Sequence, residues 1–387
     1  MKVALLTREF PPEVYGGAGV HVEYLARELA ELVDLSVHCW GADRAIPGVH
    51  AHRPWDALRS AEAYSGALEA ISVDLAMAGA VGDAQLVHSH TWYANLAGHL
   101  AKLLHAVPHV VTVHSLEPMR SWKAEQLGGG YQLSSWVEKT AIENAAAVIA
   151  VSDGMRADIL SAYPNVDASK VHTIRNGVDA EKFSPRQDPT VLAKYTITGR
   201  YALFVGRITR QKGLAHLLRA WQDVPSEYGL VIAAGSPDEP GIGKEIAELI
   251  EELKRSRSNI WWIQNMLPHD ELTSLLTAAD LFLCPSIYEP LGIVNLEAMG
   301  CATAVLGSAV GGIPEVVVDG VTGKLVEYTT DHQIFEANLS GAIISLMAKP
   351  DLLITYGNAG RARVQSEFGW DAIAETTLAL YSQVLSH

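Results

Sequence analysis

Asp280-Leu-Phe-Leu-Cys-Pro-Ser-Ile-Tyr-Glu-Pro-Leu-Gly-Ile-Val-Asn-Leu-Glu-Ala-Met-Gly300 is the stretch that decides the fold. The apolar run at 280–284 predicts a buried strand that ends in a proline-containing loop, and residues 291–300 predict the helix that follows. A strand, a loop and a helix form the repeating unit of a parallel sheet covered by helices. The stretch therefore favours the α/β class.

Two carboxylates lie eight residues apart in this stretch, one in the loop and one about two turns into the predicted helix: Glu289 and Glu297. Between them, Gly292 allows a ligand to approach the backbone, and the amides of the first helical turn can receive a diphosphate. One glutamate can accept hydrogen bonds from sugar hydroxyls and the other from a ribose. Two surface acids are the alternative, but the flanking proline, glycine and buried strand favour a sugar-nucleotide site.

The same alternation of apolar runs and amphipathic stretches continues along the chain. Predicted strands lie at 2–7, 34–39, 85–88, 109–113, 147–151, 171–174, 201–205, 229–233, 260–263, 280–284 and 303–306, with a helix at 18–32 after the first strand. A turn-rich segment near 176–189 reads as a linker. We predict two doubly wound Rossmann-like domains facing a cleft, residues 1–178 and 179–370, with a C-terminal helix at 371–387 that crosses back to the first domain.

Length and charge agree with this organisation. A chain of 387 residues suits two cores rather than one. Its net charge of −15 argues against nucleic acid or an anionic membrane as a partner. The N-terminal apolar run is too short for a signal peptide or a membrane span, so we expect a cytoplasmic protein. The three cysteines, Cys39, Cys284 and Cys301, lie in apolar segments and are expected to be buried free thiols.

No metal or cofactor is expected. His88 and His90 are close in sequence, but we predict that they point to opposite faces of their strand, which argues against a zinc site. The chain has no D-x-D motif, no H-E-x-x-H motif, no P-loop and no G-x-S-x-G motif. Neither a metal-bridged diphosphate nor covalent serine chemistry is therefore favoured.

Cations follow the predicted strand at 201–205, in Gly206-Arg-Ile-Thr-Arg-Gln-Lys-Gly213. Arg207 can fork two phosphate oxygens, and Lys212 adds a point charge near a helix start. A solvated basic loop is the alternative, but a basic cluster at a strand end of an acidic chain favours an anion site. After the first strand, the amides around Gly16, Gly17 and Gly19 could approach a phosphate, although a bare turn explains that pattern equally well.

Other strand ends in the first half carry further candidates. His114 follows the strand at 109–113, and a strand-end histidine facing a ligand cleft can be a site residue. Beyond it, Arg120 and Lys123 precede Gly128-Gly-Gly130 and could receive an anionic acceptor, with an ordinary exposed loop as the alternative.

Together, E-x7-E from Glu289 to Glu297, G-R-x-x-x-Q-K-G from Gly206 to Gly213, and His114 resemble the retaining GT-B glycosyltransferases. The resemblance covers essentially the whole chain and is strongest to the bacterial glycogen-synthase-like branch that uses ADP-glucose. The run at 112–131 is similar to actinobacterial members that make α-maltose 1-phosphate. The resemblance implies ADP-glucose as co-substrate with no metal required, and it is compatible with a homodimer.

The residues that the resemblance implies fall into a catalytic group and a donor-binding group. The catalytic group is His114, Arg207, Lys212 and Glu289. The donor-binding group is Gly16, Gly17, Gly19, Leu291, Gly292, Ile293 and Glu297. In these roles the two cations neutralise the leaving diphosphate, and the two glutamates bind the glucose and the ribose.

Two departures from the longer starch and glycogen synthases bear on the acceptor. This chain has Tyr15-Gly16-Gly17 where those enzymes carry a lysine, and His90-Thr91 where they carry His-Asp. Both weaken a polymer-elongating role and favour a small sugar phosphate such as glucose 1-phosphate. The predicted acceptor group is Thr91, Ser115, Arg120 and Lys123.

The expected reaction therefore gives α-maltose 1-phosphate and ADP, in α-glucan (glycogen) biosynthesis. Elongation of an α-1,4-glucan from ADP-glucose or UDP-glucose is the alternative within the same class. A GT-B sugar-nucleotide epimerase and a non-catalytic sugar-nucleotide-binding protein are alternatives from other classes.

Overall fold

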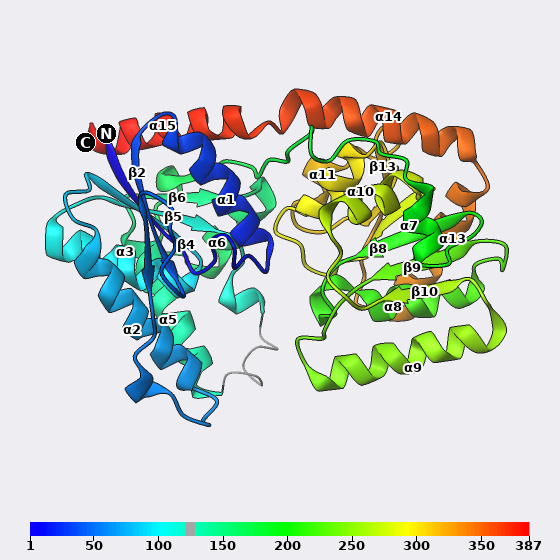
Figure 1. Cartoon of the computed structure of the whole chain (residues 1–387), viewed down its shortest axis with the longest axis horizontal. Coiled ribbons are helices and arrows are strands. Elements are labelled where there is room, and N and C mark those ends of the chain that lie inside the picture. The colour runs from blue at the N-terminus through cyan, green and yellow to red at the C-terminus, as the bar shows by residue number, and fades with distance from the viewer. Residues whose placement is uncertain (121–127, 387) are drawn as a thin grey trace. The chain divides into compact units, whose positions relative to one another are not determined.

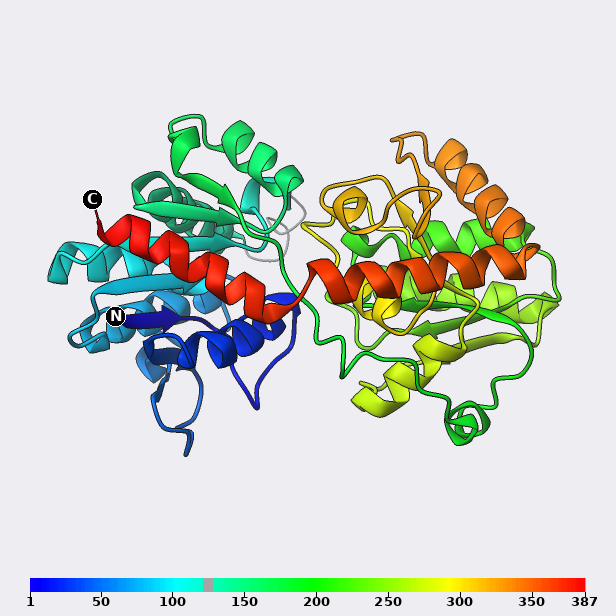
Figure 2. The same cartoon turned by 90° about the horizontal axis from the view of Figure 1, so that it is seen from above.

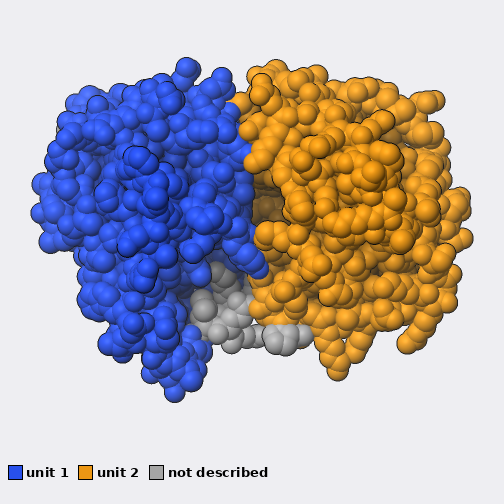
Figure 3. Space-filling model, in the orientation of Figure 1, with its two compact units in different colours: residues 1–176, 370–387 blue, residues 177–369 orange. Residues whose placement is uncertain are grey.

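The computed structural model describes residues 1–120 and 128–386, apart from the side chain of Pro240. The chain forms two compact units, residues 1–176 with 370–387 and residues 177–369 (Figure 3). The borders predicted from sequence, after residues 178 and 370, lie two residues and one residue away from these. Each unit contains its own parallel sheet.

The first unit is built on a seven-stranded parallel sheet in the order β3-β2-β1-β4-β5-β6-β7. Its strands are β1 (Lys2–Leu6), β2 (Asp34–Trp40), β3 (Val49–His52), β4 (Leu86–His90), β5 (His109–Val113), β6 (Ala147–Ala150) and β7 (Val171–Thr173). Its helices are α1 (Gly17–Ala30), α2 (Ser65–Ala80), α3 (Trp92–His105), α5 (Gly129–Asn144), α6 (Asp153–Ala162) and α15 (Trp370–Leu385).

Helices cover both faces of this sheet. Side chains alternate across a strand, so Val3 and Leu5 of β1 pack against α1 and α15 on one face. Ala4 and Leu6 pack against α2 and α3 on the other face. The last helix thus returns to the first unit, as predicted, and Figures 1 and 2 show it in red beside α1.

The second unit holds a six-stranded parallel sheet in the order β10-β9-β8-β11-β12-β13. Its strands are β8 (Tyr201–Val205), β9 (Gly229–Ala233), β10 (Ile260–Ile263), β11 (Leu281–Cys284), β12 (Val305–Ser308) and β13 (Gly323–Val326). Its helices are α7 (Pro189–Lys194), α8 (Leu214–Ala220), α9 (Pro240–Ser256), α10 (His269–Ala278), α11 (Ile293–Gly300), α12 (Ile313–Val316), α13 (His332–Met347) and α14 (Pro350–Glu367). Side chains of α8, α9 and α13 share one core cluster with Ala202 and Phe204 of β8. On the opposite face, Tyr201 donates a hydrogen bond of 2.7 Å to the Leu275 carbonyl of α10.

The two doubly wound sheets predicted from sequence are confirmed, and only two edge strands, β3 and β13, were missed. Each has four residues, and half-exposed positions break the apolar run in both. Val49-His-Ala-His52 and Gly323-Lys-Leu-Val326 also contain polar residues, so these two edge strands lack the continuous apolar run by which a strand of a parallel sheet is predicted. The predicted burial of Cys39, Cys284 and Cys301 as free thiols is confirmed.

Strand order reverses between β1 and β4 in the first sheet and between β8 and β11 in the second. In open parallel sheets, ligands bind beyond the carboxyl ends of the strands at such a reversal. The loops that follow β1, β4, β8 and β11 are therefore the places where a site is expected. Among the described residues, no helix is long and apolar enough to cross a membrane.

Candidate functional site

The strand reversal of the second unit brings Lys212 and Glu289 together. Lys212 ends a 3₁₀ turn after β8, and Glu289 lies in the loop after β11. Lys212 Nζ lies 2.6 Å from Glu289 Oε2, and Ser286 Oγ donates a hydrogen bond of 3.0 Å to the same oxygen. Glu289 is only 6% exposed. Two residues predicted from separate motifs thus form one ion pair, in which Glu289 is buried and Lys212 is half-buried.

The charge on Lys212 is maintained although its side chain is only 19% exposed. Burial alone lowers the pKa of the ammonium, but the Glu289 carboxylate offsets this effect, so the pKa is raised above its ordinary value. Arg207, half-buried in the same loop, pairs with Asp238 at 2.9 Å, and its charge also acts on Lys212. A second cation therefore lies in the same loop as the lysine, and both are side chains that can bind phosphate oxygens.

Two glycines hold this pair in place, and sequence reasoning assigned a role to neither. Gly213 has φ +66°, and a Cβ there would lie 1.9 Å from the Pro285 carbonyl oxygen. Gly311 has φ +52°, and a Cβ there would lie 2.0 Å from the Glu289 carbonyl oxygen. A side chain at either position would force apart the backbones that position the pair. The available signal was a glycine shortly after a predicted strand.

Glu297 lies closer to the start of its helix than predicted. The prediction of two turns was wrong because Gly292 has φ +92°, so α11 begins at Ile293 and Glu297 lies about one turn in. Leu291 is buried, whereas Ile293 and Glu297 are half-buried. Burial raises the pKa of Glu297 to about 7, with the Lys212 charge acting in the opposite direction. Lys212 and Glu297 are thus close enough to interact electrostatically.

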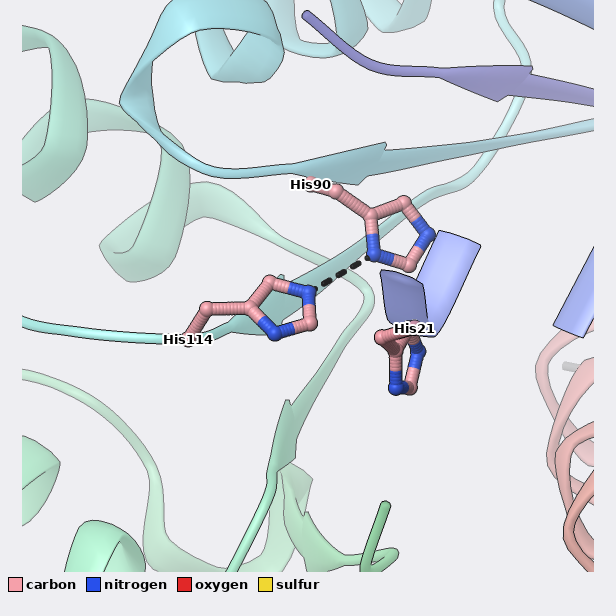
Figure 4. A group of neighbouring side chains, drawn as sticks. All are labelled: His21, His90 and His114. Carbon is pink, nitrogen blue, oxygen red and sulfur yellow. Dashed lines mark hydrogen bonds between the residues drawn. The ribbon is translucent and has the colours of Figure 1, made fainter. Parts of the chain in front are cut away.

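In the first unit, three histidines from separate elements meet (Figure 4): His21 of α1, His90 at the end of β4, and His114 after β5. His90 Nδ1 lies 3.0 Å from His114 Nε2. His21 Nδ1 lies 2.8 Å from Asn176 Oδ1. One ring nitrogen from each histidine lies within 4.8 Å of the others. The predicted strand-end His114 is therefore part of a cluster that the sequence did not indicate.

This cluster is uncharged. Burial lowers the pKa of each ring, that of His21 to about 4, and neighbouring histidines lower those of His90 and His114 further. Neutral imidazole is the form that binds a metal. The Nε2 atoms of His21 and His90 are buried and have no hydrogen-bond partner among the described residues. The cluster can therefore hold a metal ion or donate hydrogen bonds to a polar ligand.

The prediction that His88 and His90 point to opposite faces was wrong. Residues two apart on a strand point to the same face, and the two ring centroids lie 4.3 Å apart. His88 is fully hydrogen-bonded, because Nδ1 lies 2.6 Å from the Tyr381 hydroxyl and Nε2 lies 2.7 Å from Thr112 Oγ1. His88 is thus a structural residue that packs against His90 of the cluster.

The glycine turn before α1 already holds an anion, the carboxylate of Glu9. Glu9 Oε2 accepts hydrogen bonds of 2.8 Å from the amides of Tyr15 and Gly16. A Cβ at Gly19 would lie 2.5 Å from the same oxygen. Two amides at this turn, those of Tyr15 and Gly16, are therefore already occupied by a carboxylate. A phosphate would have to displace Glu9, which the sequence reading did not consider.

The predicted acceptor residues are not all available to a ligand. Arg120 Nη1 donates to Ser115 Oγ at 3.2 Å and lies 3.9 Å from Glu117 Oε1, so these side chains bind one another. Thr91 differs, since it has φ +64° and its buried hydroxyl has no hydrogen-bond partner among the described residues. Such backbone conformations cluster at functional sites. Lys123 lies outside the described residues.

The buried carboxyl groups of Glu117 and Glu138 support the loop that carries Ser115 and Arg120. Glu138 Oε1 accepts from the Glu117 amide at 2.9 Å and from the Tyr163 hydroxyl at 2.5 Å. Burial, together with the Glu117 charge, raises the pKa of Glu138 to about 8. Glu138 therefore carries a proton at neutral pH in the folded protein.

Glu138→Gln is expected to remove a pH dependence of stability. The folded protein keeps a proton on Glu138 between its ordinary pKa of 4.5 and about 8, whereas the unfolded chain releases it. The unfolding free energy of the wild type therefore falls as pH rises through this window, and the uncharged variant avoids that loss. Thermal melts from about pH 5 to about pH 8.5 should show the variant gaining in Tm relative to the wild type. Parallel curves would contradict the assigned protonation state.

Comparison with known proteins shows the family to which the chain belongs. The model of Glycosyltransferase Family 4 matches residues 15–182, and that of Glycosyl transferases group 1 matches residues 193–363. Alpha-maltose-1-phosphate synthase of Mycolicibacterium smegmatis is 53% identical over 390 residues, covering 99% of this chain and 100% of the relative. The enzyme of that name from Mycobacterium tuberculosis has the same identity and coverage.

Among solved structures, sucrose-phosphate synthase from Thermosynechococcus elongatus superimposes with a TM-score of 0.82 at 25% identity. The superposition covers 100% of this chain and 99% of that one. Two parallel-sheet units of this kind define the GT-B class of glycosyltransferases. Within this class, the chain belongs to the same family as the alpha-maltose-1-phosphate synthases of the two organisms above.

Proposed function

We propose that the protein is a retaining glucosyltransferase that moves glucose from ADP-glucose to glucose 1-phosphate, giving α-maltose 1-phosphate and ADP. The reaction belongs to α-glucan (glycogen) biosynthesis. The observation that carries the proposal is the part-buried Lys212–Glu289 pair, 2.6 Å apart at a strand reversal, with Arg207 in the same loop. The full-length similarity to the synthases supports this choice of substrates.

In this proposal, the residues of the second unit bind the donor. Departure of ADP places negative charge on a diphosphate, which Lys212 and Arg207 stabilise more strongly as the charge develops. Glu289 accepts hydrogen bonds from glucose hydroxyls while its ion pair keeps Lys212 in place. The backbone at Leu291, Gly292 and Ile293 receives the sugar and phosphate, and Glu297 binds the ribose.

The residues of the first unit have their own roles in this proposal. His114 donates a hydrogen bond to the donor sugar as a neutral imidazole, so it adds no positive charge near an anomeric centre that itself becomes cationic. The turn at Gly16, Gly17 and Gly19 contributes to donor binding once the Glu9 carboxylate no longer accepts hydrogen bonds from the Tyr15 and Gly16 amides. Thr91 supplies an unpaired hydroxyl for the acceptor. This proposal assigns no role to a metal ion or a cofactor.

Elongation of an α-1,4-glucan remains the alternative within the same class. A glucan chain has no phosphate, so a site for it needs aromatic and hydroxyl contacts rather than cations. An epimerase or a non-catalytic binding protein would need no acceptor at all. The acceptor requirement therefore separates the two transferase reactions from each other and from the other two functions, and turnover of ADP-glucose alone separates the epimerase from the binding protein.

ADP release, followed with ADP-glucose plus glucose 1-phosphate, glycogen or no acceptor, tests the proposal. The proposal predicts rapid release only with glucose 1-phosphate. Rapid release only with glycogen would establish polymer elongation. Loss or isomerisation of ADP-glucose without any acceptor would indicate the epimerase, and no turnover in any mixture would indicate a binding protein.

Glu297→Gln is expected to raise the KM for ADP-glucose and to remove its pH dependence. A ribose hydroxyl donates best to an ionised carboxylate, and Glu297 ionises only as pH rises through about 7. The wild-type KM should therefore fall from about pH 6 to about pH 8, whereas the variant should show a flat KM roughly 10-fold higher at the upper pH.

The matched control for this prediction is Glu248→Gln, which changes an exposed helical glutamate of the same unit. It should leave the KM profile unchanged. If the Glu297 variant retained the wild-type pH profile, Glu297 would not be the group that binds the ribose.

A further inference from the structure

Arg8 follows β1 directly and lies between two aromatic side chains. Its Cζ atom lies 4.1 Å from the ring centroid of Tyr93 and 5.2 Å from that of Trp40. The two rings meet edge to face at 88°, and Tyr93 also stacks on the buried Trp92 with centroids 4.1 Å apart. Because both rings are held by neighbours, the guanidinium has a fixed position at little cost in side-chain entropy.

The hydrogen-bond donors of Arg8 are unused. The side chain is exposed, and among residues 1–120 and 128–386 it makes no hydrogen bond and no ion pair. Arg120, which the sequence suggested for the acceptor phosphate, instead binds Ser115 and faces Glu117. Aromatic faces orient a cation without neutralising it, whereas a carboxylate does neutralise it. Of these two arginines, only Arg8 has no carboxylate or hydroxyl partner among the described residues, so its charge and its N–H groups are available to a ligand.

The surroundings of Arg8 suit an anion. β1 and β4 are neighbours at the strand reversal of the first sheet, with Leu6 opposite Ser89. Tyr93, on which Arg8 lies, is two residues after Thr91, whose buried hydroxyl has no partner among the described residues. Thr91 also precedes α3 and does not cap it with its side chain. The positive end of that helix dipole thus adds to the charge of Arg8.

We propose that Arg8 binds the phosphate of the sugar-phosphate acceptor, with the Thr91 hydroxyl and the start of α3 as its partners. This proposal rests on the proposed function, because it names the residues by which that reaction selects a phosphorylated acceptor. Arg8 is a specificity residue here, since the phosphate it binds is not the group that reacts. It replaces Arg120 in the acceptor site predicted from sequence.

The experiment is a steady-state comparison of wild type, Arg8→Gln and Arg8→Lys. The KM for glucose 1-phosphate is measured at saturating ADP-glucose, and the KM for ADP-glucose at saturating glucose 1-phosphate. Loss of a bidentate charged contact should raise the first KM about 30-fold in Arg8→Gln and less in Arg8→Lys. The KM for ADP-glucose should stay within about two-fold, and competitive inhibition by inorganic phosphate should weaken in parallel.

Arg27→Gln is the matched control, since Arg27 is also an exposed arginine over an aromatic ring of the first unit, 4.8 Å from the Tyr24 centroid. It should change neither KM. An unchanged KM for glucose 1-phosphate in Arg8→Gln would overturn the proposal, as would a rise in the KM for ADP-glucose instead, which would place the donor's phosphates at Arg8. If Arg8→Gln failed to fold, Arg8→Lys would decide on the same criteria. A wild type inactive with glucose 1-phosphate would overturn the proposed function itself, and this proposal with it.

Discussion

Replacing Lys212 with glutamine should reduce kcat by about 1,000-fold, since removal of one preorganised group that stabilises developing negative charge costs about 100- to 1,000-fold. Lys212 is half-buried and charged, 2.6 Å from Glu289. Glutamine keeps a hydrogen-bond donor for the Glu289 carboxylate, so the variant loses the charge without leaving that oxygen unpaired. The KM for ADP-glucose should change less than kcat, because the diphosphate gains charge as it leaves.

The control for Lys212→Gln is Lys194→Ala. Lys194 also lies 2.6 Å from a glutamate, Glu271, but its side chain is 55% exposed and it lies outside the candidate site. An exposed pair contributes little, so this variant should keep nearly full activity. A Lys212→Gln protein that melts normally and turns over within about five-fold of the wild type would contradict the role assigned to Lys212.

Replacing His114 with alanine should reduce kcat/KM for ADP-glucose by about 100-fold, because a buried hydrogen bond to the donor sugar is lost and water takes its place. His114 contacts His90 and His21, whose pKa values are lowered by burial. Since all three rings are neutral, kcat/KM of the Glu297→Gln variant, which lacks the Glu297 titration, should show no further step from a histidine between about pH 6 and about pH 8.

His50→Ala serves as the control for the histidine variant. His50 is exposed on the edge strand β3 and stacks on His38, away from the cluster. It should have no effect on kcat/KM. A His114→Ala enzyme as active as the His50 variant would remove the histidine cluster from the proposed donor site.

The fold could be predicted because the central strands of a parallel sheet are continuous apolar runs bounded by glycine and proline. Residues 109–113, 201–205 and 229–233, all central strands, were predicted with the bounds that the structure shows. What could not be predicted were the edge strands β3 and β13, whose four-residue sequences lack a continuous apolar run.

The candidate site was predictable where a motif lies within one loop and unpredictable where distant segments meet. Lys212 and Glu289 were each visible in a local motif, although their ion pair joins residues 77 apart. His21 and Asn176 are 155 residues apart, and no local pattern connects them. The occupation of the glycine turn by Glu9 and the placement of Arg8 on Tyr93 likewise depend on side-chain packing across strand ends.

The most direct test of the central claim is phosphorus and proton NMR of the products formed from ADP-glucose and glucose 1-phosphate without added metal. The account predicts ADP and one new sugar phosphate in equal amounts, with a newly formed α-configured glycosidic linkage. Glucose 1-phosphate recovered unchanged while glycogen added to the same protein takes up glucose would contradict it.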